Sequence, residues 1–346
     1  CKPAASLQSR RDQATAPPPR AVDAVSGHLR ARTAHLRTGS QKEPENDRWV
    51  WKYDKDISGL RSLCATLPML KNPIELDLSN CALSVDGVNL IARAIEAGAD
   101  VNSLTLDSNG IFGELYSSGN VKEADKFVAD CDAFLAALKE SNIVTLSLQK
   151  TGLGPLTLRK LATSLPAALN SVTVDSTGDM RRQKTYTLTA GEENIDLNSK
   201  NLGPADVTLV AAWLTTDASA TLNSIALDGC TITGTTFGTG YKQHQGGDYE
   251  KIEKLDADLS GFISFCSSLK SSQIVNLSLK KCYLGPQALA MLADAIKFMA
   301  AIARLSLSGN KLGCGAPVKD YMKSAGLDAW YQYFERHLPS NLETIQ

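Results

Sequence analysis

The clearest hydrophobic pattern in the chain lies between Ile274 and Gly313. Two sets of five residues share one spacing there and lie 28 residues apart: Ile274, Leu277, Leu279, Cys282 and Leu284, and Ile302, Leu305, Leu307, Asn310 and Leu312. Leucines two residues apart point to one face of a short strand. Apolar residues at helical spacing follow Gly285 and Pro286, and proline suits the first position of a helix. The pattern therefore predicts stacked units of strand, turn, helix and turn.

The same pattern recurs along the chain at irregular intervals. Its strands are expected around nine apolar residues: Leu76, Leu104, Leu146, Val172, Ile195, Ile225, Leu277, Leu305 and Ile345. The successive intervals are 28, 42, 26, 23, 30, 52, 28 and 40 residues. Each of the three long intervals inserts residues after the strand and before the helix, at 112–125, 233–258 and 313–326. Insertions at one position of a repeat are expected on one side of the molecule.

The pattern also has a longer period. The segment NIDLNSKNLGPADVTLVAAWL after Glu193 parallels IELDLSNCALSVDGVNLIARAI after Pro73, which predicts two related halves at about 73–178 and 193–312. The 23-residue interval between the halves is too short for a normal helix. Residues 185–189, Thr-Tyr-Thr-Leu-Thr, predict an extended excursion there, with three cations exposed at its base: Arg181, Arg182 and Lys184.

The two ends of the chain differ from these units. Residues 1–47 are rich in Arg, Ala, Ser and Pro, and the first 41 residues hold seven Lys and Arg against two acids. We expect a disordered basic segment, a plain tail rather than an organelle transit peptide. Trp49, Trp51 and Tyr53 alternate, and residues 48–72 are expected to cap the first unit rather than to form an aromatic ligand platform. We expect the sequence to be a fragment whose last repeat is truncated.

These units resemble the leucine-rich repeats of the ribonuclease-inhibitor-like class, which is also found in NOD-like receptors and Ran GTPase-activating proteins. The resemblance covers about residues 57–346 and rests on the spacing L-x-x-L-x-L-x-x-(N/C)-x-L. It implies an α/β solenoid over residues 48–346, a curved horseshoe with parallel strands on the concave face and helices on the convex face. It also implies a binding scaffold rather than a catalyst. The long intervals depart from the regular repeat of the family.

Composition and charge narrow the class of function. The net charge of −1 gives no signal for nucleic acid, and no apolar run reaches the roughly 18 residues of a membrane span. Three of the eight cysteines occupy the Asn/Cys position of the pattern, which is expected to bond backbone groups of neighbouring units: Cys81, Cys230 and Cys282. No Cys-x-x-Cys pair occurs. We therefore expect reduced buried thiols, no zinc site and a cytoplasmic protein, with organelle import through the basic segment as the alternative.

Polar residues are expected on the concave face, beside the strand leucines. Asp107, Asp175 and Asp228 occupy one position of the pattern. Such a column can accept a basic partner or a metal, but short polar residues also suit a crowded, solvated sheet, and we favour that second interpretation. The insertion at 233–258 is rich in glycine yet lacks the Gly-Lys-(Ser/Thr) of a phosphate-binding loop. His244 within it cannot carry a mechanism alone.

We therefore expect a monomeric, non-enzymatic scaffold that binds another protein through its concave face and its insertions. The residues expected to contact the partner are five carboxylates and five aromatics: Asp77, Asp107, Asp175, Asp196, Asp228, Phe112, Tyr116, Phe237, Tyr241 and Tyr249. No cofactor, metal, nucleic acid or membrane is expected to bind. The alternative, taken from the family resemblance, is a regulatory repeat domain of the GTPase-activating or immune-sensor type.

Overall fold

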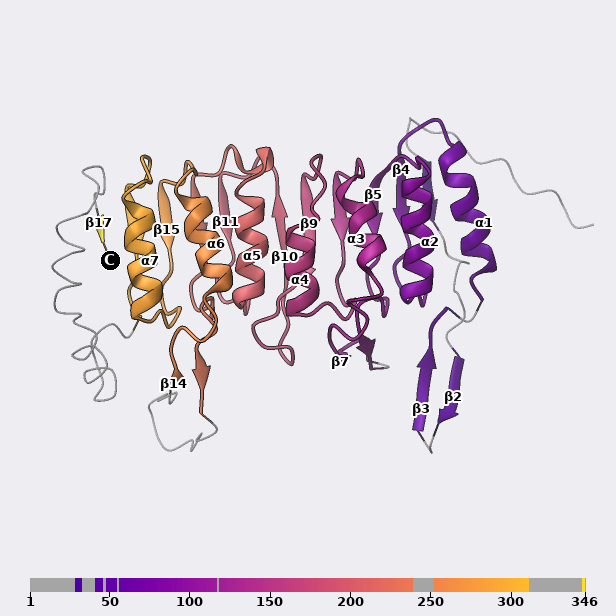
Figure 1. Ribbon diagram of the computed structural model, residues 1–346, viewed down its shortest axis with the longest axis horizontal. Coiled ribbons are helices and arrows are strands. Elements are labelled where there is room, and N and C mark those ends of the chain that lie inside the picture. Colours follow the sequence, from indigo (N-terminus) through magenta and orange to yellow (C-terminus); the bar gives the residue numbers. More distant parts are fainter. Residues whose placement is uncertain are drawn as a thin grey trace, which may run out of the picture.

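The protein is a mixed α/β chain in which a row of helices covers a row of strands. The computed structural model describes residues 53–54, 56–116, 118–238 and 252–310, together with the backbone of four strands outside these ranges: β1 (Leu29–Arg32), β2 (Gln41–Glu45), β3 (Arg48–Lys52) and β17 (Thr344–Ile345). Figure 1 shows that helices and strands follow one another in chain order along the long axis of the molecule.

Two larger sheets contain most of the strands. The first has the order β1-β4-β5-β8-β9-β10 and includes β4 (Ile74–Asp77), β5 (Val101–Thr105), β8 (Thr145–Ser147), β9 (Ser171–Asp175) and β10 (Thr185–Thr189). The second has the order β11-β12-β15-β16-β17 and includes β11 (Asn194–Asp196), β12 (Ser224–Ala226), β15 (Asn276–Ser278) and β16 (Arg304–Ser306). Neighbouring strands are parallel except β9 and β10. Parallel neighbours require a crossover connection, and the helices lie in these connections.

The strand register follows the hydrophobic pattern. The apolar residues that mark the predicted strands pair with one another in succession: Leu76, Leu104, Leu146 and Val172 in the first sheet, and Ile195, Ile225, Leu277, Leu305 and Ile345 in the second. Of these side chains, those that the structure describes are at most 8% exposed. A buried face specifies register strongly, because a slip of one residue would turn the apolar side chain outward. The prediction of parallel strands at these positions is confirmed.

The helices form one layer over the sheets. Those among the described residues are α1 (Ser58–Thr66), α2 (Val85–Glu96), α3 (Asp132–Lys139), α4 (Pro155–Ala162), α5 (Pro204–Trp213), α6 (Ser260–Leu269) and α7 (Pro286–Ile296), with short 3₁₀ helices η1 (Leu67–Met69) and η2 (Asp217–Ser219). A proline opens α4, α5 and α7, where its missing N–H leaves no bond unmade. Leu60 and Leu67 of the expected cap are buried in the core. None of the described helices combines the length and the apolar character that crossing a bilayer requires.

Seven of the strands lead into a turn of one geometry. In seven of the described units, the residue two positions after the second apolar strand residue has a left-handed backbone, with φ from +52° to +75°: Asn80, Ser108, Lys150, Ser199, Gly229, Lys281 and Gly309. This conformation costs most residues about 1–2 kcal/mol. At Lys150 and Lys281 the packing of the unit therefore imposes the turn, since lysine has no preference for it.

Two asparagines join neighbouring units. Asn109 Oδ1 accepts hydrogen bonds from the N–H groups of Cys81 and Leu83, and its Nδ2 donates to the carbonyls of Leu78 and Leu106, all at 2.8 to 3.0 Å. Asn310 makes the four equivalent bonds to Cys282, Leu284, Leu279 and Leu307. The thiols of Cys230 and Cys282 donate to the carbonyls of Leu197 and Leu227. The role expected for the Asn/Cys position is confirmed.

The first departure from the predicted organisation lies near the N-terminus. β1 and β2 fall within residues 1–47, for which the sequence predicts no regular structure. β1 adds to the edge of the first sheet in parallel with β4, and β2 pairs with β3. An edge strand binds through backbone N–H and C=O groups, so the polar composition of the segment does not prevent pairing.

The second departure is a break between the two larger sheets. The extended excursion expected at 185–189 is confirmed as β10, which pairs antiparallel with β9. Among the described strands, no backbone ladder joins β10 to β11. The sheet is therefore interrupted between the two predicted halves.

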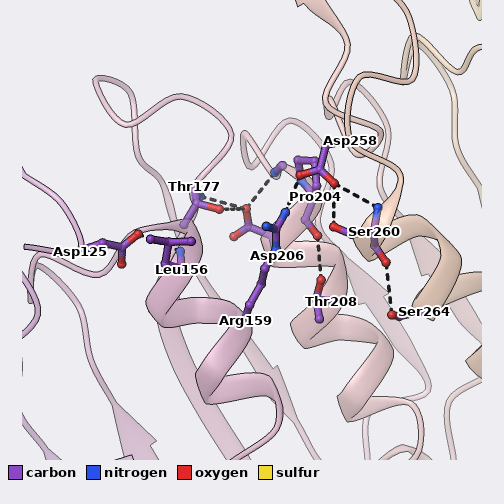
Figure 2. Close-up of polar contacts among 11 residues, drawn as sticks. Asp125, Leu156, Arg159, Thr177, Pro204, Asp206, Thr208, Asp258, Ser260 and Ser264 are labelled. Carbon is purple, nitrogen blue, oxygen red and sulfur yellow. Dashed lines mark hydrogen bonds and ion pairs between the residues drawn. The ribbon is translucent and has the colours of Figure 1, made fainter. Parts of the chain in front are cut away.

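The helical layer continues across this interruption. Arg159 on α4 reaches over the first turn of α5 and pairs with Asp258 at the start of α6, with Nη2 2.5 Å from Oδ2 (Figure 2). α5 and α6 approach so closely that a Cβ on Gly261 would lie 1.8 Å from the carbonyl oxygen of Pro204. Glycine is therefore required at this contact between two helices of the second half. The Arg159–Asp258 pair links a helix of the first half to the start of a helix of the second.

Three antiparallel hairpins among the described residues leave one edge of the molecule (Figure 1): β2–β3, β6–β7 (Glu114–Leu115 and Val121–Glu123) and β13–β14 (Thr236–Phe237 and Ile252–Lys254). The second and third are the insertions at 112–125 and 233–258, and the expectation that insertions share one side is confirmed for them. The insertion at 313–326 lies outside the described residues. Each hairpin is followed, two residues on, by an aspartate with a left-handed backbone: Asp54, Asp125 and Asp256.

These three residues, the capping aspartates, fix the hairpins to helices of the following units. Their carboxylates accept hydrogen bonds from N–H groups of Ser84 and Gly87 at α2, of Gly154, Leu156 and Thr157 at α4, and of Gly285, Gln287 and Ala288 at α7. The first N–H groups of a helix have no partner within it, and negative charge is favoured there. Glycine permits the approach, because a Cβ on Gly154 would lie 2.5 Å from Asp125 Oδ2.

Candidate functional site

A groove of about 640 Å³ opens beside the second hairpin, at the carboxyl ends of β8 and β9. We call it the hairpin groove. Its walls are the β6–β7 hairpin and the loop between β9 and β10, and its floor is the edge of the sheet. The lining residues used below are Tyr116, Lys122, Lys150, Asp175, Arg181 and Thr185. Sites beyond the carboxyl ends of parallel strands, and concavities of this volume, commonly bind ligands.

The first wall, the β6–β7 hairpin, is fixed at both ends. At its start the Phe112 N–H donates to the Thr151 carbonyl at 2.9 Å. Gly113 approaches Gly152 so closely that an added Cβ would lie 2.8 Å from the Gly152 carbonyl oxygen. At its end the capping aspartate Asp125 holds the start of α4 (Figure 2). The wall is thus anchored to the unit that follows it.

The second wall, the loop between β9 and β10, is also closed by hydrogen bonds. The Ser176 N–H donates to the Lys184 carbonyl at 2.9 Å, and the Lys184 N–H donates to Ser176 Oγ at 3.0 Å. Asn201 of the next unit donates through Nδ2 to the carbonyls of Asp179 and Arg182. Both walls are therefore preorganised, which lowers the ordering cost of binding.

The floor of the groove joins the two walls through Asp175. This residue is 7% exposed, and its carboxylate accepts hydrogen bonds from the Lys150 N–H and the Thr185 hydroxyl, each at 2.6 Å. The Lys150 residue itself is exposed. The carboxylate is thus occupied by donors of the protein, whereas the Lys150 ammonium is open to solvent.

Positive charge predominates in the hairpin groove. Its lining contains three cations, Lys122, Lys150 and Arg181, and one carboxylate, that of Asp175. Lys122 pairs with Glu114 at 2.7 Å, and hydrogen bonds from Lys122 and Lys126 lower the pKa of Glu114. Within the described part of the chain, neither the Lys150 ammonium nor the Arg181 guanidinium pairs with a carboxylate.

Two further ammonium groups lie beside the groove. Lys184 Nζ donates to the Ser199 carbonyl at 2.6 Å, and Lys200 Nζ donates to the Thr185 carbonyl at 3.3 Å. A carbonyl oxygen positions an ammonium group but does not cancel its charge. A concave site lined by charge of one sign concentrates ligands of the opposite sign.

The predicted column of aspartates is used mainly within the protein. Its hydrogen bonds run to the neighbouring strand: Asp107 Oδ1 accepts from the Ser147 hydroxyl and the Gln149 N–H, and Asp228 Oδ1 accepts from the Ser278 hydroxyl and the Lys280 N–H, all at 2.7 to 2.8 Å. Burial raises the pKa of Asp107, with a further contribution from the charges of Asp175 and Asp77, while its hydrogen bonds lower it. These contacts favour the interpretation of the column as sheet residues over its interpretation as a docking surface.

The two remaining predicted carboxylates are exposed. Asp77 accepts hydrogen bonds from the N–H and the hydroxyl of Ser79, at 2.9 and 2.6 Å. Asp196 accepts one from the Asn198 N–H at 2.9 Å. Neither residue lines the hairpin groove, so their role in binding stays a prediction.

The predicted aromatic contacts have different positions in the structure. Phe112 is 0% exposed and packs against Phe134 with ring centroids 6.4 Å apart. Its prediction as a partner contact is therefore wrong, because the chain turns outward only after this residue. Tyr116 is 55% exposed and lines the groove. Phe237 is half-buried, edge-to-face with Tyr283 at 4.9 Å, and Tyr241 and Tyr249 lie outside the described residues.

The cysteines that the structure describes do not line the hairpin groove. Six are free and buried: Cys64, Cys81, Cys131, Cys230, Cys266 and Cys282. Burial raises the pKa of Cys64 to about 11 and those of Cys131, Cys266 and Cys282 to about 12. A thiol must ionise to act as a nucleophile, so these groups are inert near neutral pH. Within the described ranges, no group of three His, Cys, Asp or Glu residues is arranged to hold a metal.

The cations of the groove were not among the predicted partner contacts. Lys150 follows the second leucine of its unit, and Arg181 begins the basic run Arg181-Arg182 before β10. Both positions follow the end of a strand, and this placement is the sequence feature that could have identified them as site residues. The hydrophobic pattern alone does not show that the β6–β7 hairpin folds toward them.

No protein-family model matches this chain, and no curated protein matches it significantly.

Proposed function

We propose that this chain is a leucine-rich-repeat solenoid of the ribonuclease-inhibitor-like class and a non-enzymatic scaffold that binds another protein. Three features support the solenoid: the succession of parallel strands, the left-handed residue after seven of them, and the equivalent bonds of Asn109 and Asn310. Stacked units of this kind bury their core between neighbours and leave the edges for recognition.

The observation that carries the binding function is the hairpin groove. Its two walls are fixed by hydrogen bonds, while Lys150 and Arg181 lack carboxylate partners within the described residues and Tyr116 is largely exposed. Tyrosine and arginine are enriched among residues that dominate binding energies. A rigid surface with unpaired cations and an exposed aromatic ring is suited to recognition.

The composition of the groove supports binding rather than catalysis. Its one lining carboxylate, Asp175, already accepts two hydrogen bonds, and its other charged side chains are cations. General acid–base or nucleophilic chemistry requires an available base or nucleophile beside the reacting group. We therefore assign the site to recognition of a partner.

A photo-crosslinking experiment tests this proposal. A photoreactive phenylalanine analogue replaces Tyr116, which is 55% exposed in the groove, and as a control replaces Ile263, which is 51% exposed on α6. After irradiation in cell extract, we expect a discrete protein adduct at position 116 that excess unlabelled protein suppresses. Adducts that are identical at both positions, or insensitive to competition, would contradict the proposal.

A further inference from the structure

The two unpaired cations of the hairpin groove are held by their backbones, not by their charged groups. The Lys150 N–H donates to Asp175 Oδ2 at 2.6 Å, and the Arg181 N–H donates to Asp179 Oδ1 at 2.9 Å. Lys150 belongs to the floor and Arg181 to the second wall, and both residues are exposed. Their attachment points are therefore fixed while the ammonium and the guanidinium groups are free to bind a ligand.

The surroundings reinforce this positive charge. The nearby ammonium groups of Lys184 and Lys200 bind carbonyl oxygens, and the Glu114 carboxylate is already paired with Lys122 and Lys126. Asp175 contributes the one carboxylate of the lining, and its oxygens are engaged by Lys150 N–H and Thr185. The free hydrogen-bonding capacity of the groove thus consists mainly of charged donors.

We propose that the hairpin groove binds an acidic segment of a partner protein, with carboxylate or phosphate oxygens on Lys150 and Arg181. A guanidinium group bonds either oxyanion through two parallel N–H groups, and an ammonium group acts as a point charge. This inference rests on the proposed function, because it specifies the chemistry of the partner at the same site. The aspartates of the concave face suggest a basic partner, whereas the cations of the groove suggest an acidic one.

Two other occupants fit the groove less well. The first 41 residues of the chain hold seven Lys and Arg against two acids, so the N-terminal segment has the same sign of charge as the groove. Proteins that depend on nucleic-acid phosphates commonly neutralise about 6–10 of them, whereas the groove offers Lys150 and Arg181. A short acidic peptide matches this small number of cations.

Fluorescence anisotropy with defined peptides tests the inference. The probes are a short labelled peptide of alternating Glu and Gly, the same peptide with phosphoserine in place of Glu, the same with Lys in place of Glu, and a single-stranded DNA of similar length. We expect both anionic peptides to bind, with an affinity that falls as salt rises, and the Lys peptide not to bind. The relative affinities of the Glu and phosphoserine peptides then distinguish a carboxylate source from a phosphate source.

Two matched double variants locate the binding. Lys150→Asn with Arg181→Gln removes both groove cations, and we expect it to weaken the anionic peptides about tenfold or more. Lys281→Asn with Arg61→Gln changes the charge equally, since Lys281 has the same turn position as Lys150 and Arg61 is an exposed arginine on α1, but neither lines the groove. We expect this control pair to bind as the unmodified protein does. Unchanged urea unfolding of both pairs shows that the fold is retained.

The outcomes separate this inference from the proposed function. Equal binding of Glu and Lys peptides, or an equal loss in both double variants, would overturn the acidic-segment assignment. Tighter binding of DNA than of either peptide, lost only in the groove variant, would overturn it in favour of nucleic acid. A protein adduct at position 116 that is insensitive to Lys150→Asn with Arg181→Gln would retain the scaffold and reject the acidic segment. Binding of the anionic peptides without any protein adduct at position 116 would retain the acidic ligand and reject the scaffold.

Discussion

The hydroxyl and the N–H of Thr177 both donate to Oδ2 of Asp206, at 2.7 and 2.9 Å, and so tie the loop after β9 to α5 (Figure 2). Gly203 N–H adds a third bond to the same oxygen at 2.8 Å. Asp206 Oδ1 and the Tyr186 hydroxyl are buried, and the two side chains interact. Burial raises the pKa of Asp206 to about 6, although hydrogen bonds from Gly203, Thr177 and Tyr186 lower it. The carboxyl group at the interruption of the sheet therefore resists ionisation.

The first prediction concerns stability against pH. The pKa of Asp206 is higher in the folded protein than its usual 3.8, so between about pH 4 and pH 6 the folded state binds more protons than the unfolded state. This group therefore lowers the free energy of unfolding as pH rises through that window, by about 2 to 3 kcal/mol in total. Asp206→Asn keeps an acceptor for Thr177 and does not ionise. Urea unfolding at several pH values should show the variant gaining on the unmodified protein as pH rises, and a constant difference would contradict this.

The second prediction concerns the capping aspartate of the hairpin groove. Asp125 has φ of +59° and accepts three hydrogen bonds from the start of α4, at 2.8 to 3.0 Å. Asp125→Ala loses the cap and strains the left-handed backbone, for a cost of about 2 to 3 kcal/mol. Asp125→Asn keeps one acceptor oxygen, enough for two of the three bonds, and tolerates the conformation, so we expect a smaller cost of about 1 kcal/mol. Equal losses in the two variants, measured by urea unfolding, would show that the cap is not responsible.

The third prediction couples Gly154 to the same aspartate. A Cβ at position 154 would lie 2.5 Å from Asp125 Oδ2 and 2.7 Å from its Cγ, although φ of −122° suits alanine. Gly154→Ala should therefore cost about 1 to 3 kcal/mol through overpacking. In an Asp125→Gly background the contacts with the carboxyl group are absent and the contact with Ala124 Cβ at 2.9 Å remains, so the same substitution should cost less. A double-mutant cycle measures the difference, and additive effects would rule out the contact as the cause.

The fourth prediction compares two asparagines. Asn109 is 0% exposed, and Asn109→Ala would leave the N–H groups of Cys81 and Leu83 and the carbonyls of Leu78 and Leu106 without this partner. Unmet hydrogen bonds cost about 1–3 kcal/mol each when buried, so we expect a loss of at least about 3 kcal/mol. Asn198→Ala removes one bond, to the Asp228 N–H, at an exposed position. Its loss should stay below about 1 kcal/mol, and chemical denaturation of both variants checks the contrast.

The fifth prediction concerns the backbone at Lys150. Its φ of +52° matches that of Asn80 at the equivalent turn, and asparagine tolerates a left-handed backbone. Lys150→Asn should therefore change the free energy of unfolding by less than about 0.5 kcal/mol, while Lys150→Val should lose about 1–2 kcal/mol. Thermal unfolding of the two variants tests this. A large loss with Asn would indicate that the lysine side chain supports the fold.

The succession of strands and helices was accessible from sequence because each strand and each helix has its own local pattern. A pair of leucines two residues apart sets a strand face, and a proline sets a helix start, so Leu277 and Pro286 are interpretable without knowledge of the rest of the chain. The strand at 185–189 was also predictable from a local pattern, since Tyr186 and Leu188 alternate with threonines. Backbone pairing of β1 left no such signal, because an edge strand needs little from its side chains.

The site was less accessible because its parts meet only in the folded chain. Lys150 and Arg181 are 31 residues apart in sequence and become neighbours of one groove through the stacking of units. Phe112 stands at the border of an insertion, and its direction depends on a hydrogen bond to Thr151 and contact with Phe134. Asp125 acts on α4 29 to 32 residues later. No local pattern encodes these relationships.

The capping aspartates hold the ends of the hairpins, so the side chains at the hairpin tips are less constrained by the fold. Asp125 secures the end of the β6–β7 hairpin, and the turn at its tip is closed by backbone bonds, from Tyr116 N–H to the Asn120 carbonyl and from Gly119 N–H to the Tyr116 carbonyl. Such bonds place few demands on the side chains they join. A library of variants at residues 116, 117, 118 and 120, with Gly119 and Asp125 retained, can therefore redirect specificity on an unchanged framework. As in antibodies, variable loops would then determine specificity while a rigid framework, here of strands and helices, holds them in place.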